Sequence, residues 1–280
     1  MISVAMATYN GEAFIEEQLS SILNQSFLVD EIIICDDCST DNTLNIIERI
    51  IRENSLNINL KVISNNKNIG YIDNFYKAIS LTRGEYIFLA DQDDIWEFNK
   101  VEKYMELMEK YDLVCSQFQL IDSSGCLIQN MEDFKINRLL KKNNKNISEI
   151  SIFKLAFGNI APGCTYCISK EIKDIYLKLK NKEVIHDYQL MLIGAVYGKV
   201  GLYSTSLIKY RLHENNSVGF VKKDRKISLR FRKIRKTPIM ADFFHQLNKI
   251  HKIHFCFLYE LLYYLRIPYI KAKLKRAILG

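Results

Sequence analysis

The first part of the chain alternates short apolar runs with segments in which apolar residues recur at helical spacing. The apolar runs cover residues 2–7, 31–35, 61–64 and 86–90. Three helices are predicted between them, and their inward residues are Ile15, Leu19, Ile22 and Leu23; Leu44, Ile47, Ile50 and Ile51, after a cap at Asp41; and Ile72, Phe75 and Ile79. This alternation is typical of buried parallel strands joined by crossover helices. It predicts an α/β fold with a Rossmann-like, mostly parallel central sheet and flanking helices.

The second part of the chain is less regular. Residues 101–110 and 186–197 are predicted helices, and residues 113–117, 164–168 and 200–204 are predicted strands. An Asn- and Lys-rich stretch, residues 141–148, shows no periodicity and is predicted to be a loop.

Polar residues follow three of the apolar runs directly, where each predicted strand ends. They are Thr8, Tyr9 and Asn10, then Asp36 and Asp37, then Asp91-Gln92-Asp93-Asp94. Ligands of open α/β sheets bind outside the carboxyl ends of the strands. At least four carboxylates therefore meet at one edge, and so much negative charge calls for a cation. We predict a divalent metal and a phosphorylated ligand there, although a single one of these acids could instead cap a helix running from Glu97.

The candidate cation site is the Asp91-x-Asp93 pair. Mg²⁺ and Mn²⁺ take oxygen ligands and are commonly held by one or two carboxylates together with substrate phosphates. A Gly-x-Gly-x-x-Gly turn after the first strand and a Walker phosphate loop are both missing from the sequence. A nicotinamide or flavin enzyme is therefore disfavoured, and the predicted cofactor is Mg²⁺ or Mn²⁺ bridging a diphosphate.

Several short motifs follow one another between residues 7 and 216. They are Ala7-Thr8-Tyr9-Asn10, Asp36-Asp37-x-Ser39-Thr40-Asp41, Asn68-x-Gly70 with Asn74, Gly84-Glu85-Tyr86, Leu89-Ala90-Asp91-Gln92-Asp93-Asp94-Ile95-Trp96, His186-Asp187-Tyr188 and Tyr210-Arg211-x-His213-x-x-Asn216. Each is weak alone, but in this order they resemble the family 2 glycosyltransferases of the GT-A fold. The resemblance covers about residues 1–216, with a nucleotide-sugar-binding half at residues 1–100 and an acceptor half at residues 101–216.

This resemblance implies a nucleotide-sugar donor and assigns residues to it. The base and ribose would be held by Thr8, Tyr9, Asp36 and Asp37, with Asn10 in the same binding site. Asp93, together with Asp91, would hold the metal on the diphosphate of the donor.

Asp187 falls at the position of the family's catalytic base. Inverting transfer needs a carboxylate that takes the proton of the acceptor hydroxyl while the sugar carbon is attacked opposite the departing nucleotide. The alternative is that Asp187 caps the helix predicted from residue 186. A helix dipole would lower its pKa, whereas a base benefits from a raised pKa.

Arg211 and His213 lie in the last motif and are expected to reach the diphosphate and order a loop over the donor. The alternative is a surface turn with ordinary salt bridges. The motif differs from the Gln-x-x-Arg-Trp signature of processive synthases, so transfer of one sugar per encounter is expected.

Within the family, the Asp-Gln-Asp-Asp and His-Asp-Tyr motifs most resemble bacterial enzymes that build O-antigen, capsule or cell-wall polysaccharide. The first expectation for the donor is dTDP-L-rhamnose, with a lipid-linked glycan as the acceptor. A UDP-hexose or UDP-N-acetylhexosamine donor would use the same carboxylates. An alternative of another class is a catalytically silent GT-A module that binds a membrane or a partner.

The charge of the chain is concentrated at one end. Residues 222–280 carry 16 Lys and Arg against 3 acidic residues, whereas the rest carries 23 against 29. Apolar residues recur at helical spacing in this tail, first at Ile227, Phe231 and Ile234. We therefore predict a basic amphipathic helical extension over residues 217–280 that contacts an anionic inner-leaflet membrane surface. The alternative is that its apolar face packs on the body of the protein.

Seven cysteines are scattered along the chain, which indicates a reducing compartment rather than a disulfide framework. No secretory signal pattern begins the sequence, so we expect a cytoplasmic protein, peripheral at the cytoplasmic face of the plasma membrane. The pairs Cys35-x-x-Cys38 and Cys164-x-x-Cys167 lie too far apart for a zinc ribbon and are predicted to be buried thiols. Nucleic acid is not an expected partner, because base-stacking aromatics do not interleave the basic run at residues 222–236.

Overall fold

The structure, a computed structural model, describes residues 1–128, 146–155, 159–179, 181, 184–214, 219–223 and 226–230. Helices and strands alternate through the first part as the sequence predicts. In chain order the elements are β1 (Ile2–Thr8), α1 (Ile15–Leu23), β2 (Glu31–Asp36), α2 (Thr43–Glu53), β3 (Asn59–Ser64), α3 (Tyr71–Leu81), β4 (Tyr86–Ala90), β5 (Ile95–Trp96), α4 (Lys100–Met108), β6 (Leu113–Ile121), β7 (Ile147–Glu149), α6 (Ile152–Leu155), η1 (Gly163–Thr165), β8 (Tyr166–Ser169), α7 (Lys170–Leu179), α8 (His186–Tyr197), β9 (Val200–Arg211), β10 (Gly219–Lys223) and β11 (Lys226–Arg230).

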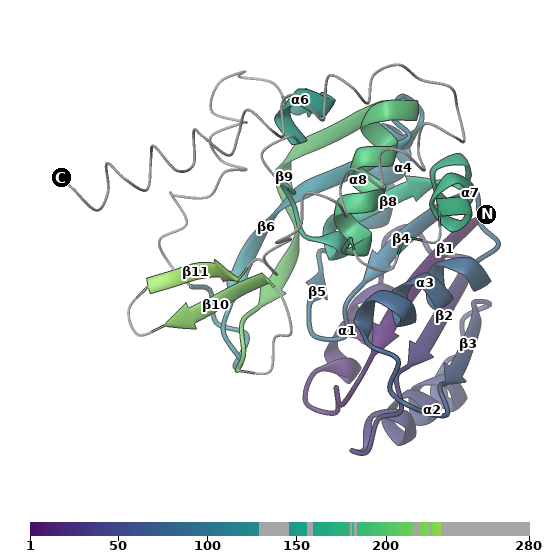
Figure 1. Ribbon diagram of the computed structural model, residues 1–280. Helices are drawn as coiled ribbons and strands as arrows, with labels where there is room; N and C mark the ends of the chain where they lie inside the picture. Colours follow the sequence, from purple (N-terminus) through teal and green to yellow (C-terminus); the bar gives the residue numbers. More distant parts are fainter. Residues whose placement is uncertain are drawn as a thin grey trace.

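One mixed sheet of nine strands dominates the described part of the chain. Its order is β3-β2-β1-β4-β8-β6-β9-β5, with β7 also paired to β9. β1 is parallel to β2 and β4, and β2 is parallel to β3, which confirms the predicted parallel strands. β8 runs antiparallel to both β4 and β6, so the sheet is mixed beyond β4. The carboxyl ends of β1, β2 and β4 consequently lie at one edge (Figure 1).

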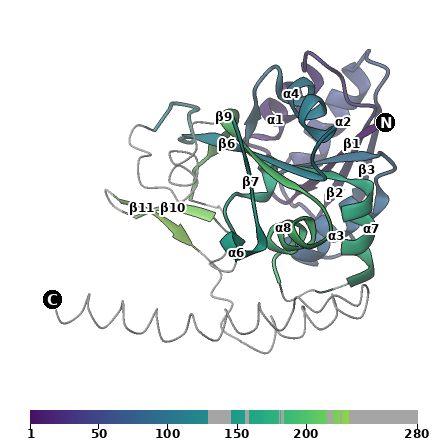
Figure 2. The same cartoon turned by 90° about the horizontal axis from the view of Figure 1, so that it is seen from above.

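Helices cover both faces of this sheet. α1, α2 and α4 lie on one face, and α3, α7 and α8 lie on the other (Figure 2). Most of the predicted inward residues are buried, namely Ile15, Leu19, Ile22, Ile47, Ile50, Ile72, Phe75 and Ile79. Leu23, Leu44 and Ile51 are only partly buried. Each fully buried side chain of this size contributes roughly 1.5–3 kcal/mol, which holds the helices against the sheet.

Several strand bounds differ from the predicted ones. β6 extends to Ile121 and β9 to Arg211, because the two strands pair with each other well past Gln117 and Ser204. β7 begins at Ile147, inside the stretch predicted to be a loop. β5 has only two residues, too few for a periodic signal, and it is positioned by pairing with β9.

Two helices also begin at residues that differ from the predicted ones. α2 has Asn42 at its cap position, although the Asp41 carboxylate still accepts the Thr43 N–H at 3.1 Å. α4 begins at Lys100 with Asn99 at its cap position. The carboxylates at residues 91–94 therefore do not cap α4, and the capping alternative for them is wrong.

The predicted helix over the basic run is wrong where the structure describes that run. β10 and β11 form an antiparallel two-stranded sheet over residues 219–223 and 226–230. The sequence Lys226-Ile227-Ser228-Leu229-Arg230 alternates apolar and polar residues with a period of two, which suits a strand. Residues 231–280, including the rest of the predicted amphipathic extension, lie outside the described residues. Within the described residues, no helix combines the length and the apolar character needed to cross a bilayer.

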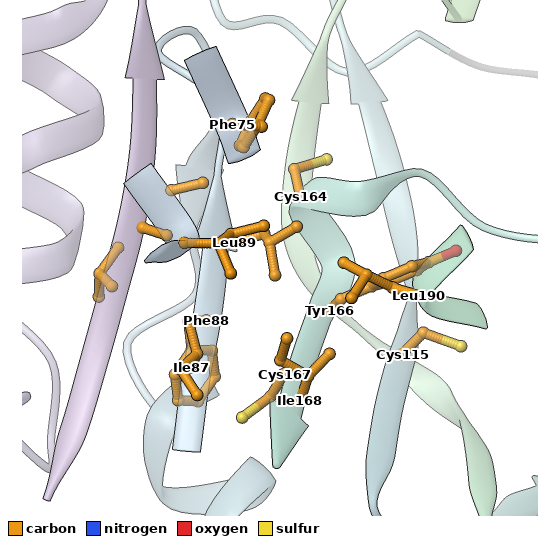
Figure 3. Packing of buried hydrophobic residues seen from close by; sticks show 14 of the residues in the cluster. Phe75, Ile87, Phe88, Leu89, Cys115, Cys164, Tyr166, Cys167, Ile168 and Leu190 are labelled. Carbon is orange, nitrogen blue, oxygen red and sulfur yellow. The ribbon is translucent and has the colours of Figure 1, made fainter. Parts of the chain in front are cut away.

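The core continues from the parallel strands into the mixed half of the sheet. Cys167 and Ile168 of β8 lie between Phe88 of β4 and Cys115 of β6 (Figure 3). Cys35, Cys164 and Cys167 are buried and free, as predicted for core thiols, whereas Cys38 is partly exposed. Burial raises the pKa of the Cys35 thiol to about 11, so it is protonated and inert at neutral pH.

Candidate active site

A cavity of about 660 Å³ lies at the carboxyl ends of β1 and β4, within the size range of small-molecule sites. Eight of the residues predicted from sequence line it: Thr8, Tyr9, Asn10, Asp37, Asp91, Asp93, Asp187 and His213. Two predicted residues, Asp36 and Arg211, are not among the residues that line it. The structure therefore brings together motifs from both halves of the chain.

Asp37 lines the cavity and is held by several hydrogen bonds. Its carboxylate accepts the backbone N–H groups of Ile69 and Gly70, each at 2.8 Å, and the side-chain amide of Asn65 at 2.9 Å. The side chain is 1% exposed. Asp37 thus joins the end of β2 to the start of α3, and it fixes the cavity wall formed by both elements.

Asp36 lies behind this wall. Its carboxylate accepts the Thr8 hydroxyl at 2.9 Å and the Ser39 N–H at 2.9 Å, and it is fully buried. Asn10 has a φ of 48°, in the left-handed region that Asn tolerates, and its side-chain oxygen accepts the Thr40 N–H at 2.8 Å. In this structure Asp36 supports the polar turns around the cavity and does not form its surface.

Two other acidic residues in the wall of the cavity, Asp91 and Asp187, have raised pKa values. Burial, followed by the charges of Asp94, Asp93 and Asp187, raises the pKa of Asp91 well above its usual range. Asp187 is one residue inside α8, whose cap position is Ile185, so it does not cap the helix. Burial raises the pKa of Asp187 to about 7, and hydrogen bonds from the Tyr188 N–H and the Asn159 side chain offset only part of that effect. The dipole of α8 was expected to lower the pKa of Asp187, but the effect of burial is larger and the pKa is raised.

Arg211 is almost completely buried, at 2% exposed. Its backbone N–H donates to Asp94 Oδ1 at 3.0 Å, and its Nε donates to the Asp93 carbonyl oxygen at 2.8 Å. Another guanidinium nitrogen pairs with Glu17, and the guanidinium carbon lies 4.8 Å from the centre of the Phe14 ring. Arg211 therefore anchors the acidic loop from behind. It does not line the cavity, so the expected contact of Arg211 with the diphosphate is not what the structure shows. The alternative of a surface turn is also wrong for this residue, because Arg211 is the buried last residue of β9.

His213 follows Arg211 and does reach the cavity. Its Nε2 lies 2.7 Å from Asp93 Oδ2, and its ring centroid lies 4.9 Å from that of Phe14. Asp93 and His213 together present a carboxylate and an imidazole at the same point of the cavity wall.

Residues 3–163 match the family model described as Glycosyl transferase family 2. The match covers more than half of the chain. This chain belongs to glycosyl transferase family 2. It is a glycosyltransferase, and its acidic cavity lies at the edge of the sheet where the family resemblance predicts the nucleotide-sugar.

Two curated relatives of this family 2 glycosyltransferase have names that specify a nucleotide-sugar donor. The chain is 34% identical over 229 residues to dTDP-rhamnosyl transferase RfbG of Shigella flexneri, which covers 76% of this chain and 73% of the relative. It is 29% identical over 145 residues to the UDP-Glc:alpha-D-GlcNAc-diphosphoundecaprenol beta-1,3-glucosyltransferase WfgD of Escherichia coli, covering 50% of this chain and 55% of the relative.

A solved structure shares the fold of this glycosyltransferase. Residues 1–349 of TarS from S. aureus, in complex with UDP, match with a TM-score of 0.61 over 88% of this chain and 65% of that chain. The sequence identity is 19%, so the match supports the fold alone. The predicted α/β architecture with flanking helices is confirmed for the described part of the chain, whereas the sheet is mixed and not mostly parallel.

The acidic residues of this glycosyltransferase fit a divalent metal. Asp91, Asp94 and Cys164 offer ligand atoms within 4.8 Å of one another, but Asp94 and Cys164 are buried and do not line the cavity. Asp91 and Asp93 do line it, so a metal that also contacts a diphosphate would be held by these two. The raised pKa of Asp91 arises partly from neighbouring carboxylates, and that repulsion is what a bound cation would relieve.

Two residues that line the cavity of the glycosyltransferase were not assigned roles from the sequence. Gln92 forms two hydrogen bonds with the backbone of Tyr9, and His186 stacks on Phe75 beside Asp187. Gln92 lies within the Asp91-Gln92-Asp93-Asp94 motif and His186 within His186-Asp187-Tyr188. Membership of these motifs is the one feature of the sequence that indicates a place in the site. Their contacts join segments far apart in the chain, so spacing could not reveal them.

Proposed function

We propose that this glycosyltransferase transfers a single sugar from a nucleotide-diphosphate sugar to a glycan acceptor, with inversion and with a divalent metal. One observation carries the proposal: Asp187 lines the same cavity as Asp91 and Asp93, and its pKa is raised to about 7. A carboxylate with that pKa is a far better proton acceptor than an ordinary one, which suits a general base.

Asp187 acts on the acceptor hydroxyl. Its carboxylate accepts the hydroxyl proton as the acceptor oxygen bonds to the anomeric carbon of the donor sugar. The bond from that carbon to the diphosphate breaks on the opposite face, so the configuration is inverted. The hydrogen bond from the Tyr188 N–H to Asp187 Oδ1, at 2.6 Å, holds the carboxylate in place during this transfer.

Asp91 and Asp93 would hold Mg²⁺ or Mn²⁺, and a bound cation would supply positive charge to neutralise the leaving diphosphate. His213, 2.7 Å from Asp93, orients that carboxylate from the side of the cavity. Arg211 contributes indirectly, because its contacts with the Asp93 carbonyl and with Asp94 fix the backbone of the acidic loop.

The donor is proposed to be dTDP-L-rhamnose. Support comes from the name of the Shigella flexneri relative and from the length over which the two chains match. A UDP-hexose is the second candidate, because the Escherichia coli relative is named for UDP-Glc. The carboxylates of the site serve either donor.

The acceptor is proposed to be a lipid-linked glycan, as the name of the Escherichia coli relative states for that enzyme. The basic excess of residues 222–280 would then hold the protein against the anionic cytoplasmic face of the membrane, where such acceptors are found. Sedimentation with vesicles of phosphatidylglycerol and of phosphatidylcholine tests this: anionic vesicles alone should retain the protein at low salt.

Binding of four donors tests the central assignment of the cavity. dTDP-L-rhamnose, UDP-glucose, UDP-galactose and UDP-N-acetylglucosamine are titrated by calorimetry with Mn²⁺ and with EDTA. Binding of at least one donor should require the metal, and turnover of that donor distinguishes an enzyme from a catalytically silent module. Failure of all four to bind in a metal-dependent way would overturn the role given to Asp91 and Asp93.

A further inference from the structure

His186 is a buried polar residue that the proposed reaction does not use. It is the first residue of α8, next to Asp187, and it is 5% exposed. Its ring stacks on Phe75, with centroids 4.1 Å apart and an angle of 25° between the planes. Within the described part of the chain the imidazole makes no hydrogen bond, and its Nδ1 is completely enclosed. Buried polar groups in native proteins are nearly always paired. Because Nδ1 is enclosed, Nε2 is the nitrogen of this ring that could take a partner from a ligand in the cavity.

The position of the ring suits contact with a ligand. His186 lines the cavity together with Asp187 and Gly163. A Cβ on Gly163 would lie 3.2 Å from His186 Nε2 and 3.1 Å from the Cβ of Asp187. Since glycine has no side chain, the Nε2 edge of the ring is left open beside the carboxylate that the proposed reaction uses.

The chemistry of the ring limits what it can hold. Burial lowers the pKa of His186 to about 3, so the imidazole is neutral. An unpaired N–H costs more than an unpaired nitrogen lone pair, so the single proton belongs on Nε2, because Nδ1 is enclosed without a partner. His186 therefore offers one neutral N–H donor to the cavity. Such a donor matches the oxygen of a hydroxyl group better than a charged diphosphate, which recruits cations.

The neighbours of His186 connect it to the donor end of the cavity. Phe75, on which the ring stacks, belongs to α3. The first turns of that helix supply Tyr71 and Asn74 to the cavity wall, and Gly70 just before it donates its N–H to Asp37. The wall is thus continuous from the nucleotide end of the site to His186.

We propose that His186 is a specificity-determining residue that donates a hydrogen bond from Nε2 to a hydroxyl group of the donor sugar. This inference rests on the proposed function, because it takes the occupant of the cavity to be a nucleotide-sugar. The contact fixes the sugar beside Asp187 and selects donors that carry a hydroxyl group at the matching position.

Two substitutions in the full-length protein separate this role from packing. His186→Phe keeps a flat ring on Phe75 and removes the N–H donor. His186→Gln restores an amide N–H close to the position of Nε2. Thermal denaturation first checks that both variants are folded like the wild type.

The readout is the ratio of affinities for a nucleotide-sugar and for the matching free nucleotide diphosphate, measured with Mn²⁺. The nucleotide-sugar is whichever of dTDP-L-rhamnose, UDP-glucose, UDP-galactose and UDP-N-acetylglucosamine the wild type binds. We expect His186→Phe to bind it about 5- to 10-fold more weakly, with unchanged affinity for dTDP or UDP, and His186→Gln to recover most of the loss.

Other results would contradict either the role of His186 or the proposed function. Equal weakening for the sugar and for the free diphosphate, or no weakening of either, would overturn the role of His186 while leaving the proposed function intact. Absence of nucleotide-sugar binding by the wild type would instead contradict the proposed function itself.

Discussion

The side-chain amide of Gln92 pairs with the backbone of Tyr9 in both directions. The Tyr9 N–H donates to Gln92 Oε1 at 2.7 Å, and Gln92 Nε2 donates to the Tyr9 carbonyl oxygen at 3.0 Å. Gly11 makes room for this pairing, since a Cβ there would lie 2.4 Å from the same Oε1. The turn after β1, which lines the cavity, is thereby tied to the acidic loop after β4.

Breaking this link should weaken donor binding through loss of loop order. Gln92→Ala removes both hydrogen bonds, each with a net contribution of about 1 kcal/mol, so affinity for the nucleotide-sugar should fall by up to about 30-fold. Gln92→Glu should do no better, because a carboxylate oxygen then faces the Tyr9 carbonyl oxygen. Calorimetry measures both variants. Equal affinity of Gln92→Ala and wild type would show that this link does not contribute to donor binding.

Arg211 should behave as a structural anchor. Arg211→Lys loses the contacts of the guanidinium with the Asp93 carbonyl and with Glu17, and it should reduce the free energy of unfolding by about 3 kcal/mol. Urea denaturation measures the loss. Lys209→Ala on the same strand is the matched control: its ion pair with Glu97 is 3.7 Å long and half-buried, so its loss should change stability little. A variant of Arg211 with full stability and lost affinity for the diphosphate would favour a direct ligand role.

The two acidic residues of the loop should respond differently to neutralisation. Asp93→Asn should weaken Mn²⁺ binding in the presence of UDP by at least about 10-fold, because Asp93 lines the cavity. Asp94→Asn should leave Mn²⁺ affinity nearly unchanged, because Asp94 is buried against the Arg211 N–H. Titration of Mn²⁺ followed by electron paramagnetic resonance compares them. Equal losses would show that Asp94 is a metal ligand as well.

Asp187 should make the ligand-free protein less stable at neutral pH than in mild acid. Its pKa is raised from 3.8 in the unfolded chain to about 7, so between these values the native state binds more protons than the unfolded state, and stability falls as the pH rises. Asp187→Asn should therefore raise the melting temperature at pH 8 in EDTA, with a stabilisation of about 1–2 kcal/mol because water in the cavity reduces the effect. The gain should shrink towards pH 5. Glu48→Gln on the exposed side of α2 controls for net charge, and a gain independent of pH would refute the raised pKa.

The sequence was sufficient to predict structure where one physical rule acts along a continuous segment. Parallel strands with buried faces read as unbroken apolar runs, so the ends of β1, β2 and β4 could be located, and with them Asp37, Asp91 and Asp93. The motif around Asp187 gave its place in the site, but its raised pKa depends on burial by segments distant in the chain.

The sequence was insufficient where contacts between distant segments decide the outcome. Arg211 carries a charge and would ordinarily be assigned to the surface, yet three separate segments of the protein contact its guanidinium group and backbone. These are the acidic loop at Asp93 and Asp94, the turn at Asp122, and the start of α1 at Phe14 and Glu17. β5 is too short to show a period, and it exists because β9 continues beside it. The run at residues 226–230 fits both helical and strand periods over a few residues, and the strand prevailed.

Turnover by wild type and Asp187→Asn tests the central claim most directly. Both proteins are given the nucleotide-sugar that the wild type binds, Mn²⁺ and GlcNAc-diphosphoundecaprenol, and donor affinity is measured in the same samples. We predict that Asp187→Asn retains donor affinity within about threefold but loses at least about 100-fold in kcat, because the proton acceptor is gone while the binding surface remains. Unchanged turnover by Asp187→Asn would contradict the assignment of the base, and with it the mechanism built on this cavity.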